Sequence, residues 1–252
     1  MSSMALAPGA ILRRGSLLVE RRPELPALAV AAGAWVVLFA TAPRPAQPAV
    51  HHHQHMGGME HGTDAWSMSG AQRGAILWVA MTVAMMLPLT IPSLRYVGRM
   101  VPRSARLAAT ATFSAGYVVA WLPGVVLAIA VHARPPAPGS VVVAAFVVAA
   151  AWELTLLKRK ALLRCHRHHV VRAHQPARRR SCWRFGLRRG AWCMASCGPV
   201  MGALMVGAHA LVPMVVVTIG LAVQQFNPVA HWYRTWSAGG LVALAACTPL
   251  IT

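Results

Sequence analysis

Long apolar segments that carry almost no charge constrain this chain more than any other feature. The chain is 57% hydrophobic and 12% charged, whereas a soluble domain carries about 25% charged residues. A backbone in lipid must satisfy its own hydrogen bonds, which favours helices for runs of this length. The sequence therefore predicts an all-α, polytopic transmembrane helix bundle with about seven spans. The apolar runs cover about 25–42, 74–92, 107–132, 141–157, 190–212, 213–226 and 235–251.

The basic residues indicate how these helices are oriented. The chain has 24 Lys and Arg against five acidic residues, a net charge of +19. If the N-terminus is cytosolic, all of the basic residues except Arg44, Arg73 and Arg134 fall in cytosolic segments, as the positive-inside rule requires. The expected partner of this charge is the lipid bilayer. Nucleic acid is disfavoured because no basic motif with interleaved aromatic residues appears. We therefore expect a multi-pass membrane protein whose basic segments face the cytosol.

This topology divides the chain into three regions. Residues 1–42 form a basic N-terminus and a first anchor helix, and residues 43–73 form an extracytoplasmic loop rich in His and Met. Residues 74–252 form the transmembrane helical domain, with a basic cytosolic loop at 158–189 and a tight hairpin at Val212-Pro213. The end of the first run resembles a signal-peptidase site, but Pro43 directly after it argues against cleavage. We therefore treat 25–42 as an anchor.

The run at 190–212 carries sulfur and imidazole side chains at every fourth position. A helix turns about 100° per residue, so a step of four residues keeps side chains on one slowly turning stripe. Thiolate, thioether and imidazole groups suit copper(I), and the stripe is a candidate metal path. Taken alone, it is more typical of a packed helix interface, and the rest of the chain favours the metal path. The stripe consists of Cys193, Cys197, Met201, Met205 and His209.

The loop before the second run offers a second group of metal-binding side chains. Imidazole binds copper in both oxidation states and thioether favours copper(I), which suits an oxidising compartment with few reduced thiols. A flexible linker that binds nickel or zinc adventitiously is the alternative, because the observation is one of composition only. The side chains are those of His51, His52, His53, His55, Met56, Met59 and His61.

The second run contains WVAMTVAMMLP, in which Met81 and Met85 share a helix face and Met86 stands beside them. Two thioethers on one face can hold a soft ion, although core packing is the alternative. Pro88 lacks an N–H and frees a carbonyl one turn earlier, so we expect a kink or a cavity there.

Three further sites have competing interpretations. Glu153 near the end of the fourth run is expected to pair with Lys158 or Arg159, with proton or metal passage as the lesser alternative. Cys165 begins a Cys-x-x-His pattern, for which a membrane-surface basic loop is favoured over a weak transfer site. His132, with His209 of the stripe, stands at an outward helix end, where imidazole either hands on an ion or lies at the head-group level.

Four segments resemble a bacterial family of predicted metal-binding integral membrane proteins that includes membrane copper chaperones for tyrosinase-type enzymes. The segments are DAWS at 64–67, WVAMTVAMMLP at 78–88, ELTLLKRKALLRC at 153–165 and GLRRGAWCMASC at 186–197.

The resemblance implies a copper-binding protein that loads an extracytoplasmic enzyme. It assigns the family's methionines to Met81, Met85 and Met86 and its helix thiols to Cys193 and Cys197. The chain departs from the family pattern at two positions. Ser196 stands where a third thiol adjoins the second, and Ala161 stands where the basic segment has another cysteine.

The sequence thus predicts a membrane copper chaperone or transfer protein that delivers copper, as copper(I) rather than zinc, to an extracytoplasmic or membrane copper enzyme. It does not predict an enzyme, because no nucleophile triad, paired carboxylates or phosphate loop is visible. The alternatives are an accessory (structural) subunit of a membrane copper monooxygenase and a copper permease.

Overall fold

The computed structural model describes residues 22–41, 70–132, 137–166, 177–207, 211–227 and 232–247, and these ranges are helical without a strand. The predicted all-α class is confirmed for them. The longer helices are α2 (Leu25–Thr41), α3 (Gly70–Met81), α4 (Ile91–Met100), α5 (Arg106–Val119), α6 (Pro123–His132), α7 (Gly139–Leu154), α8 (Leu156–Cys165), α9 (Ala177–Val206), α10 (Leu211–Phe226) and α11 (Trp232–Cys247). The short helical segments are η1 (Thr82–Met86), η2 (Pro88–Thr90) and η3 (Arg103–Ala105).

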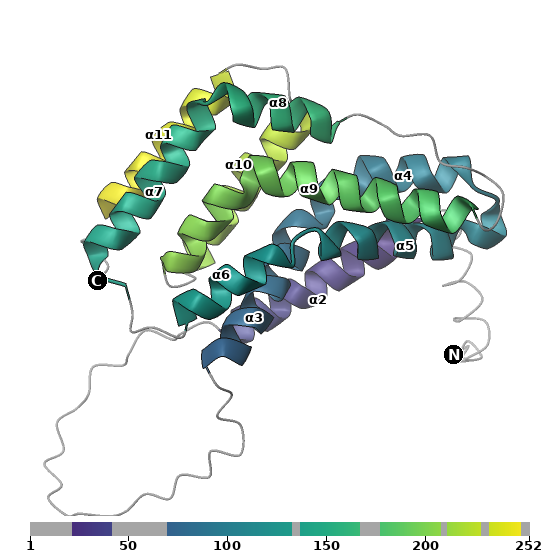
Figure 1. Cartoon of the computed structure of the whole chain (residues 1–252), viewed down its shortest axis with the longest axis horizontal. Coiled ribbons are helices and arrows are strands. Elements are labelled where there is room, and N and C mark those ends of the chain that lie inside the picture. The colour runs from purple at the N-terminus through teal and green to yellow at the C-terminus, as the bar shows by residue number, and fades with distance from the viewer. Residues whose placement is uncertain are drawn as a thin grey trace, which may run out of the picture.

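Helix α9 is the central element of the bundle. Its first half packs against α5, and α9 also contacts α6, α7 and α8, while α7 and α11 run side by side (Figure 1). Helices α3 and α6 form a second close pair, and α2 lies against α3 and η1. The largest buried cluster combines residues of α3, η1, α7, α9, α10 and α11. The stripe predicted on α9 therefore faces the middle of the protein.

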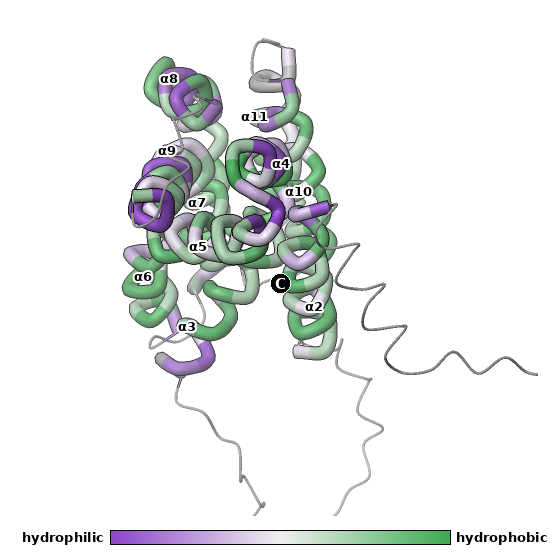
Figure 2. The backbone as a smooth tube through the Cα atoms, turned by 90° about the vertical axis from the view of Figure 1, so that its right-hand side faces the viewer, coloured by the Kyte–Doolittle hydropathy of each residue, from purple (hydrophilic) through white to green (hydrophobic). Residues whose placement is uncertain are grey.

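The apolar character of the helices does not by itself establish seven membrane spans. Among the described residues, one helical stretch, Gln72–Met100, is long and apolar enough to cross a membrane. The total rises to three if α5 with α6, bent by 48°, and α7 with α8, bent by 70°, each count as one span. Helix α2, helix α10 and Thr235–Cys247 are apolar but shorter. Hydrophilic residues are concentrated in α4, α8 and α9 (Figure 2).

The basic segment at 158–189 was expected to be a loop, and much of it is helical instead. Helix α8 continues to Cys165 and α9 begins at Ala177, while residues 167–176 lie outside the described ranges. Arg, Lys, Leu and Ala are good helix formers, and α8 also packs against α9. A run of positive charge predicts the side of the membrane but not the absence of a helix. The expected hairpin at Val212-Pro213 is also displaced, because α10 already begins at Leu211.

The break between α5 and α6 is stabilised by a tryptophan from α3. The Trp78 indole Nε1 donates a hydrogen bond of 3.0 Å to the carbonyl oxygen of Trp121, at the break. Its ring lies on Gly124, where a Cβ would approach the Trp78 ring to 1.9 Å. Trp78 is the first residue of the predicted methionine segment. Its role in the structure is to fix that segment against α6.

Glycines bring the backbones of α5 and α9 into contact. A Cβ at Gly186 would lie 2.1 Å from the carbonyl oxygen of Phe113, and a Cβ at Gly190 would lie 2.5 Å from that of Tyr117. Gly116 makes the reciprocal approach to α9, at 2.6 Å from the carbonyl oxygen of Trp183. Small residues are the usual means by which helices in membranes approach this closely. The contact places Tyr117 directly against the thiol-bearing face of α9.

We predict that Gly186→Ala forces α5 and α9 apart and destabilises the protein. Overpacking of a tight contact costs about 1–3 kcal/mol, and 1 kcal/mol lowers Tm by about 2–4 °C in a chain of this size. Thermal unfolding in detergent measures the change. Gly239→Ala is the matched control, because it adds the same methyl group to a helix with nothing within 4 Å. Equal Tm values for the two variants would contradict the prediction.

Candidate metal site

The segment that carries Met81, Met85 and Met86 is a broken helix with all three side chains fully buried. A π-helical turn at Thr82–Met86 is followed by a 3₁₀ turn at Pro88–Thr90. The Thr90 N–H donates to the carbonyl of Leu87 at 3.0 Å, rather than to that of Met86 one full turn back. The Met86 carbonyl is thereby left for another donor. The predicted distortion next to Pro88 is confirmed.

That donor is the hydroxyl of Tyr117 on α5. It lies 3.3 Å from the carbonyl oxygen of Met86 and 3.0 Å from the Sγ atom of Cys193. One buried hydroxyl thus connects the methionine segment to the first thiol of the α9 stripe. The two segments that carry the sulfur donors are more than 100 residues apart in the sequence, and this hydroxyl links the backbone of one to a thiol of the other.

The stripe on α9 lies on the buried face of that helix, as its spacing predicts. Cys193, Cys197, Met201 and Met205 are each at most 1% exposed. Ser196 is also fully buried, and its hydroxyl oxygen lies 3.3 Å from the Sγ atom of Cys197. An oxygen therefore stands where the resembled family has a third sulfur. The last member of the stripe, His209, lies outside the described residues.

Helix α8 contributes a thiol that the sequence analysis assigned to a weak, surface-lying cluster. Cys165 is 1% exposed, and the Gln225 amide Nε2 lies 3.7 Å from its Sγ atom and 3.8 Å from that of Cys193. The thiol of Cys193 also interacts with those of Cys165 and Cys197. The three cysteines form a row, named the thiol row below, with Cys193 in the middle.

The thiol row is not a closed cage. Within the described ranges, no group of three or more His, Cys, Asp or Glu side chains is arranged to hold a metal ion. The sulfur atoms follow one another from α8 along α9, and the buried methionines of η1 and α9 belong to the same core cluster. This arrangement offers pairs of soft donors rather than one site with a fixed coordination number.

A buried arginine is bound to one end of the thiol row. The Arg189 side chain is 5% exposed, and its guanidinium donates to the carbonyl oxygen of Cys165. In return, the Sγ atom of Cys165 lies 3.8 Å from the carbonyl oxygen of Arg189. These contacts hold the end of α8 on α9. They also place positive charge beside the sulfur donors, in surroundings where a buried charge needs compensation.

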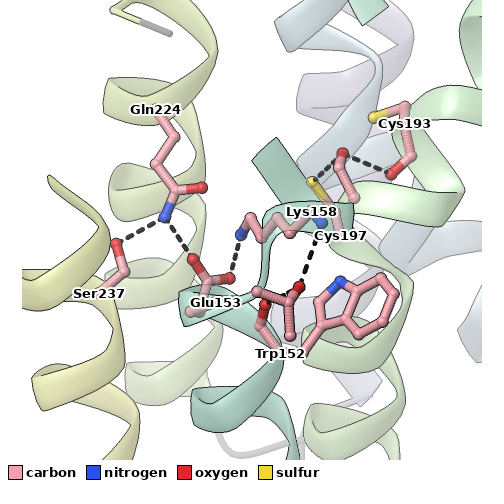
Figure 3. Close-up of polar contacts among 9 residues, drawn as sticks. Trp152, Glu153, Lys158, Cys193, Cys197, Gln224 and Ser237 are labelled. Carbon is pink, nitrogen blue, oxygen red and sulfur yellow. Dashed lines mark hydrogen bonds and ion pairs between the residues drawn. The ribbon is translucent and has the colours of Figure 1, made fainter. Parts of the chain in front are cut away.

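A second buried charge cluster lies at the sharp bend between α7 and α8. Glu153 and Lys158 are each 1% exposed and form an ion pair, as predicted, while Arg159 is exposed. The hydroxyl of Thr155 caps α8 by accepting from the backbone N–H of Lys158 at 3.1 Å. The Gln224 amide donates to Glu153 at 2.9 Å (Figure 3). Lys158 also interacts electrostatically with Cys197, so the ion pair adjoins the thiol row.

The remaining predicted residues are not brought to this site in the described ranges. His132 stands at the end of α6, half-buried, with its Nδ1 atom 3.1 Å from the carbonyl oxygen of Ala128 on the same helix. The His/Met loop is not described. Its predicted ligands His51, His52, His53, His55, Met56, Met59 and His61 therefore stay predictions.

The fold and the site together define a helical protein with a buried row of soft sulfur donors, a class suited to handling a soft metal ion. A family model described as PpoB2, copper chaperone, matches residues 75–248, more than two thirds of the chain. The chain belongs to this copper chaperone family, and the resemblance found in the sequence is confirmed. Comparison with curated proteins and with solved structures finds no match. A general role in copper handling, for which no catalytic group is required, follows from the family.

We predict that Lys158→Met strongly destabilises the protein because it leaves the Glu153 carboxylate buried without its cation. Breaking a buried ion pair from one side costs about 3–5 kcal/mol. The double variant Glu153→Gln/Lys158→Met should recover most of this loss, since both charges are then absent. Unfolding in detergent measures all three proteins. Arg159→Met, at the exposed neighbouring position, is the control and should unfold like the wild type. A stable Lys158→Met variant would show that Glu153 does not depend on this partner.

Proposed function

We propose that this protein is a membrane copper(I) chaperone that delivers its ion to an extracytoplasmic copper enzyme. The observation that carries the proposal is the position of Cys193. Its thiol contacts two other thiols, and the Tyr117 hydroxyl connects it to the methionine segment. Buried thiol and thioether donors without carboxylate ligands suit copper(I) better than they suit zinc.

The ion would be held by two sulfurs at a time and exchanged between neighbours. Cys193 belongs to both possible thiol pairs, with Cys165 and with Cys197, so an ion can pass along the row without leaving its sulfur ligands. Met201 and Met205 continue the same buried face of α9 by two further turns. Thioethers are neutral and bind copper(I) less firmly than thiolates, which suits the release end of a path.

Local charges support this use of the row. Two thiolates with one copper(I) ion carry a net charge of −1, which is costly to bury alone. Arg189 interacts with Cys165 at one end of the row, and Lys158 interacts with Cys197 at the other. The buried cations therefore provide compensation at both ends. The partner of Lys158, Glu153, is itself held by Gln224, which keeps the ammonium group in place.

We further propose the seven-span topology with a cytosolic N-terminus in the bacterial plasma membrane. In Figure 1 the beginnings of α3 and α7 lie on the same side of the bundle as the ends of α6 and α11, and α8 and the beginning of α9 lie opposite. The hydrophilic parts of α4, α8 and α9 lie away from the side at which α3 and α7 begin. This supports the assignment of that side as extracytoplasmic. Most of the predicted His/Met loop lies between the end of α2 and the beginning of α3, while residues 70–73, predicted as its last residues, are the first turn of α3. The loop would collect or dispense copper, with His132 at the end of α6 on the same side.

We predict that the variant Cys193→Ser/Cys197→Ser loses its high-affinity copper(I) site. Binding should weaken by about 100-fold or more, because even outer-shell partners of a metal are worth about 10–100-fold. Copper(I) affinity is measured by competition with a chromogenic chelator, on protein purified anaerobically. Cys165→Ser should weaken binding as well, and Met81→Leu/Met85→Leu to a smaller extent.

The matched control is Cys182→Ser/Cys247→Ser. It removes the same number of thiols, from positions in the second core cluster and on the surface. Its affinity should equal that of the wild type. If the control loses as much copper as Cys193→Ser/Cys197→Ser, the loss reflects general instability. Unchanged affinity in both double variants would remove the thiol row from the mechanism.

We predict that the protein in sealed proteoliposomes activates a copper-free tyrosinase-type enzyme on the extracytoplasmic side without net copper flux across the bilayer. A chaperone passes a bound ion by ligand exchange, whereas a permease moves many ions per chain. Enzyme activity and internal copper are measured in the same vesicles. Sustained copper uptake would favour a permease. Stoichiometric co-purification with the enzyme, without activation, would favour an accessory subunit.

A further inference from the structure

A groove of about 290 Å³ opens between α10 and α11. Its walls are apolar, with side chains such as Val217 and Leu221 from α10 and Leu241 and Leu244 from α11. Trp232 and Trp236 line it as well and are 56% and 74% exposed, so one side of the groove is open. The volume lies at the lower end of the range of about 300–1,000 Å³ that is typical of small-molecule sites.

The groove has a polar end made of Gln224, Ser237 and Glu153. The Gln224 Nε2 atom donates to the carboxylate of Glu153 at 2.9 Å and to the hydroxyl oxygen of Ser237 at 2.6 Å (Figure 3). Because a carboxylate only accepts, these contacts fix the orientation of the amide. The amide oxygen Oε1 is then buried without a hydrogen-bond partner in the described part of the chain, on a side chain that is 3% exposed.

A buried acceptor without a partner is unfavourable and points to a ligand that carries a donor. The charge of Glu153 is already compensated by Lys158, so the polar end does not call for a cation. An anion would meet the carboxylate unfavourably. The matching ligand has an apolar body and a neutral head with a hydrogen-bond donor, such as a hydroxyl group.

We propose that the groove between α10 and α11 binds a neutral hydroxyl-headed amphiphile, with its chain along the apolar walls and its hydroxyl on Gln224 Oε1. The glycines of the walls agree with an open site, because a Cβ at Gly220 or Gly240 would meet nothing within 4 Å. The hydroxyl of Ser237 stands beside the head and can complete its hydrogen bonds. The proposal is independent of the thiol row and of copper.

The test uses the full chain in nanodiscs and 10-bromodecan-1-ol, whose bromine quenches tryptophan fluorescence on contact. Saturable quenching is expected, and it should diminish in Trp236→Phe. Gly240→Leu places a side chain in the groove and should raise the half-saturating concentration about fivefold or more, the equivalent of about 1 kcal/mol. Gly239→Leu is the matched control, since its neighbouring position is equally open but does not line the groove.

Two further probes test the recognition of the head on the unaltered protein. 1-Bromodecane lacks the donor and 10-bromodecanoate carries an anion, and both should bind about fivefold or more weakly, as expected for the loss of one hydrogen bond. Equal quenching by all three probes, or quenching that rises without saturation, would overturn the proposal and leave only partitioning into the bilayer. Identical curves for Gly240→Leu and Gly239→Leu would also overturn it. A change of oligomeric state in Gly240→Leu alone would instead assign the groove to a second copy of the chain.

Discussion

The close approach of α5 and α9 is the contact on which the site depends. Gly186 and Gly190 leave no space for even a methyl group between the two backbones. Because the helices meet at this distance, the hydroxyl of Tyr117 reaches both the thiol of Cys193 and the carbonyl of Met86. A wider spacing would break this link between the thiol-bearing face of α9 and the backbone of η1. The glycines therefore affect the position of the candidate metal ligands, although they provide no ligand themselves.

The site combines soft sulfur donors with buried charged side chains, which are unusual in a protein core. Cysteine and methionine side chains pack as apolar residues, so the core can hold the donors without desolvating a permanent charge. A charge appears only when thiolates form, and Arg189 and Lys158 are already positioned at the two ends of the thiol row. Both cations are themselves held by the bundle, Arg189 on the carbonyl of Cys165 and Lys158 on Glu153. Stability and ion handling are thus served by the same contacts.

The sequence predicts the parts of this structure that depend on local periodicity. Spacing and composition predict the all-α class, the buried face of α9, the distortion before Pro88 and the pairing of Glu153 with Lys158. The seven spans stay a prediction, since the described helices α5 with α6 and α7 with α8 are bent and others are short. The His/Met loop and His209 lie outside the described ranges, and their metal binding stays a prediction too.

What the sequence did not predict depends on tertiary contacts. The charge of the segment at 158–189 predicts a loop, whereas good helix formers and packing on α9 make its described parts helical. The same charge assigns Cys165 to a surface loop, but its position beside Cys193 requires α8 to fold back after the 70° bend. In the sequence, the resemblance of 153–165 to the family is the feature that points to a functional role for the Cys165 thiol.

The convergence of sulfur ligands from separate helices is tested most directly by X-ray absorption at the copper edge of the copper(I)-loaded protein. We expect a first coordination shell dominated by sulfur, from which Cys193→Ser removes a sulfur neighbour. A shell of nitrogen and oxygen alone, unaltered in Cys193→Ser, would place the ion on the histidine-rich loop and contradict the account.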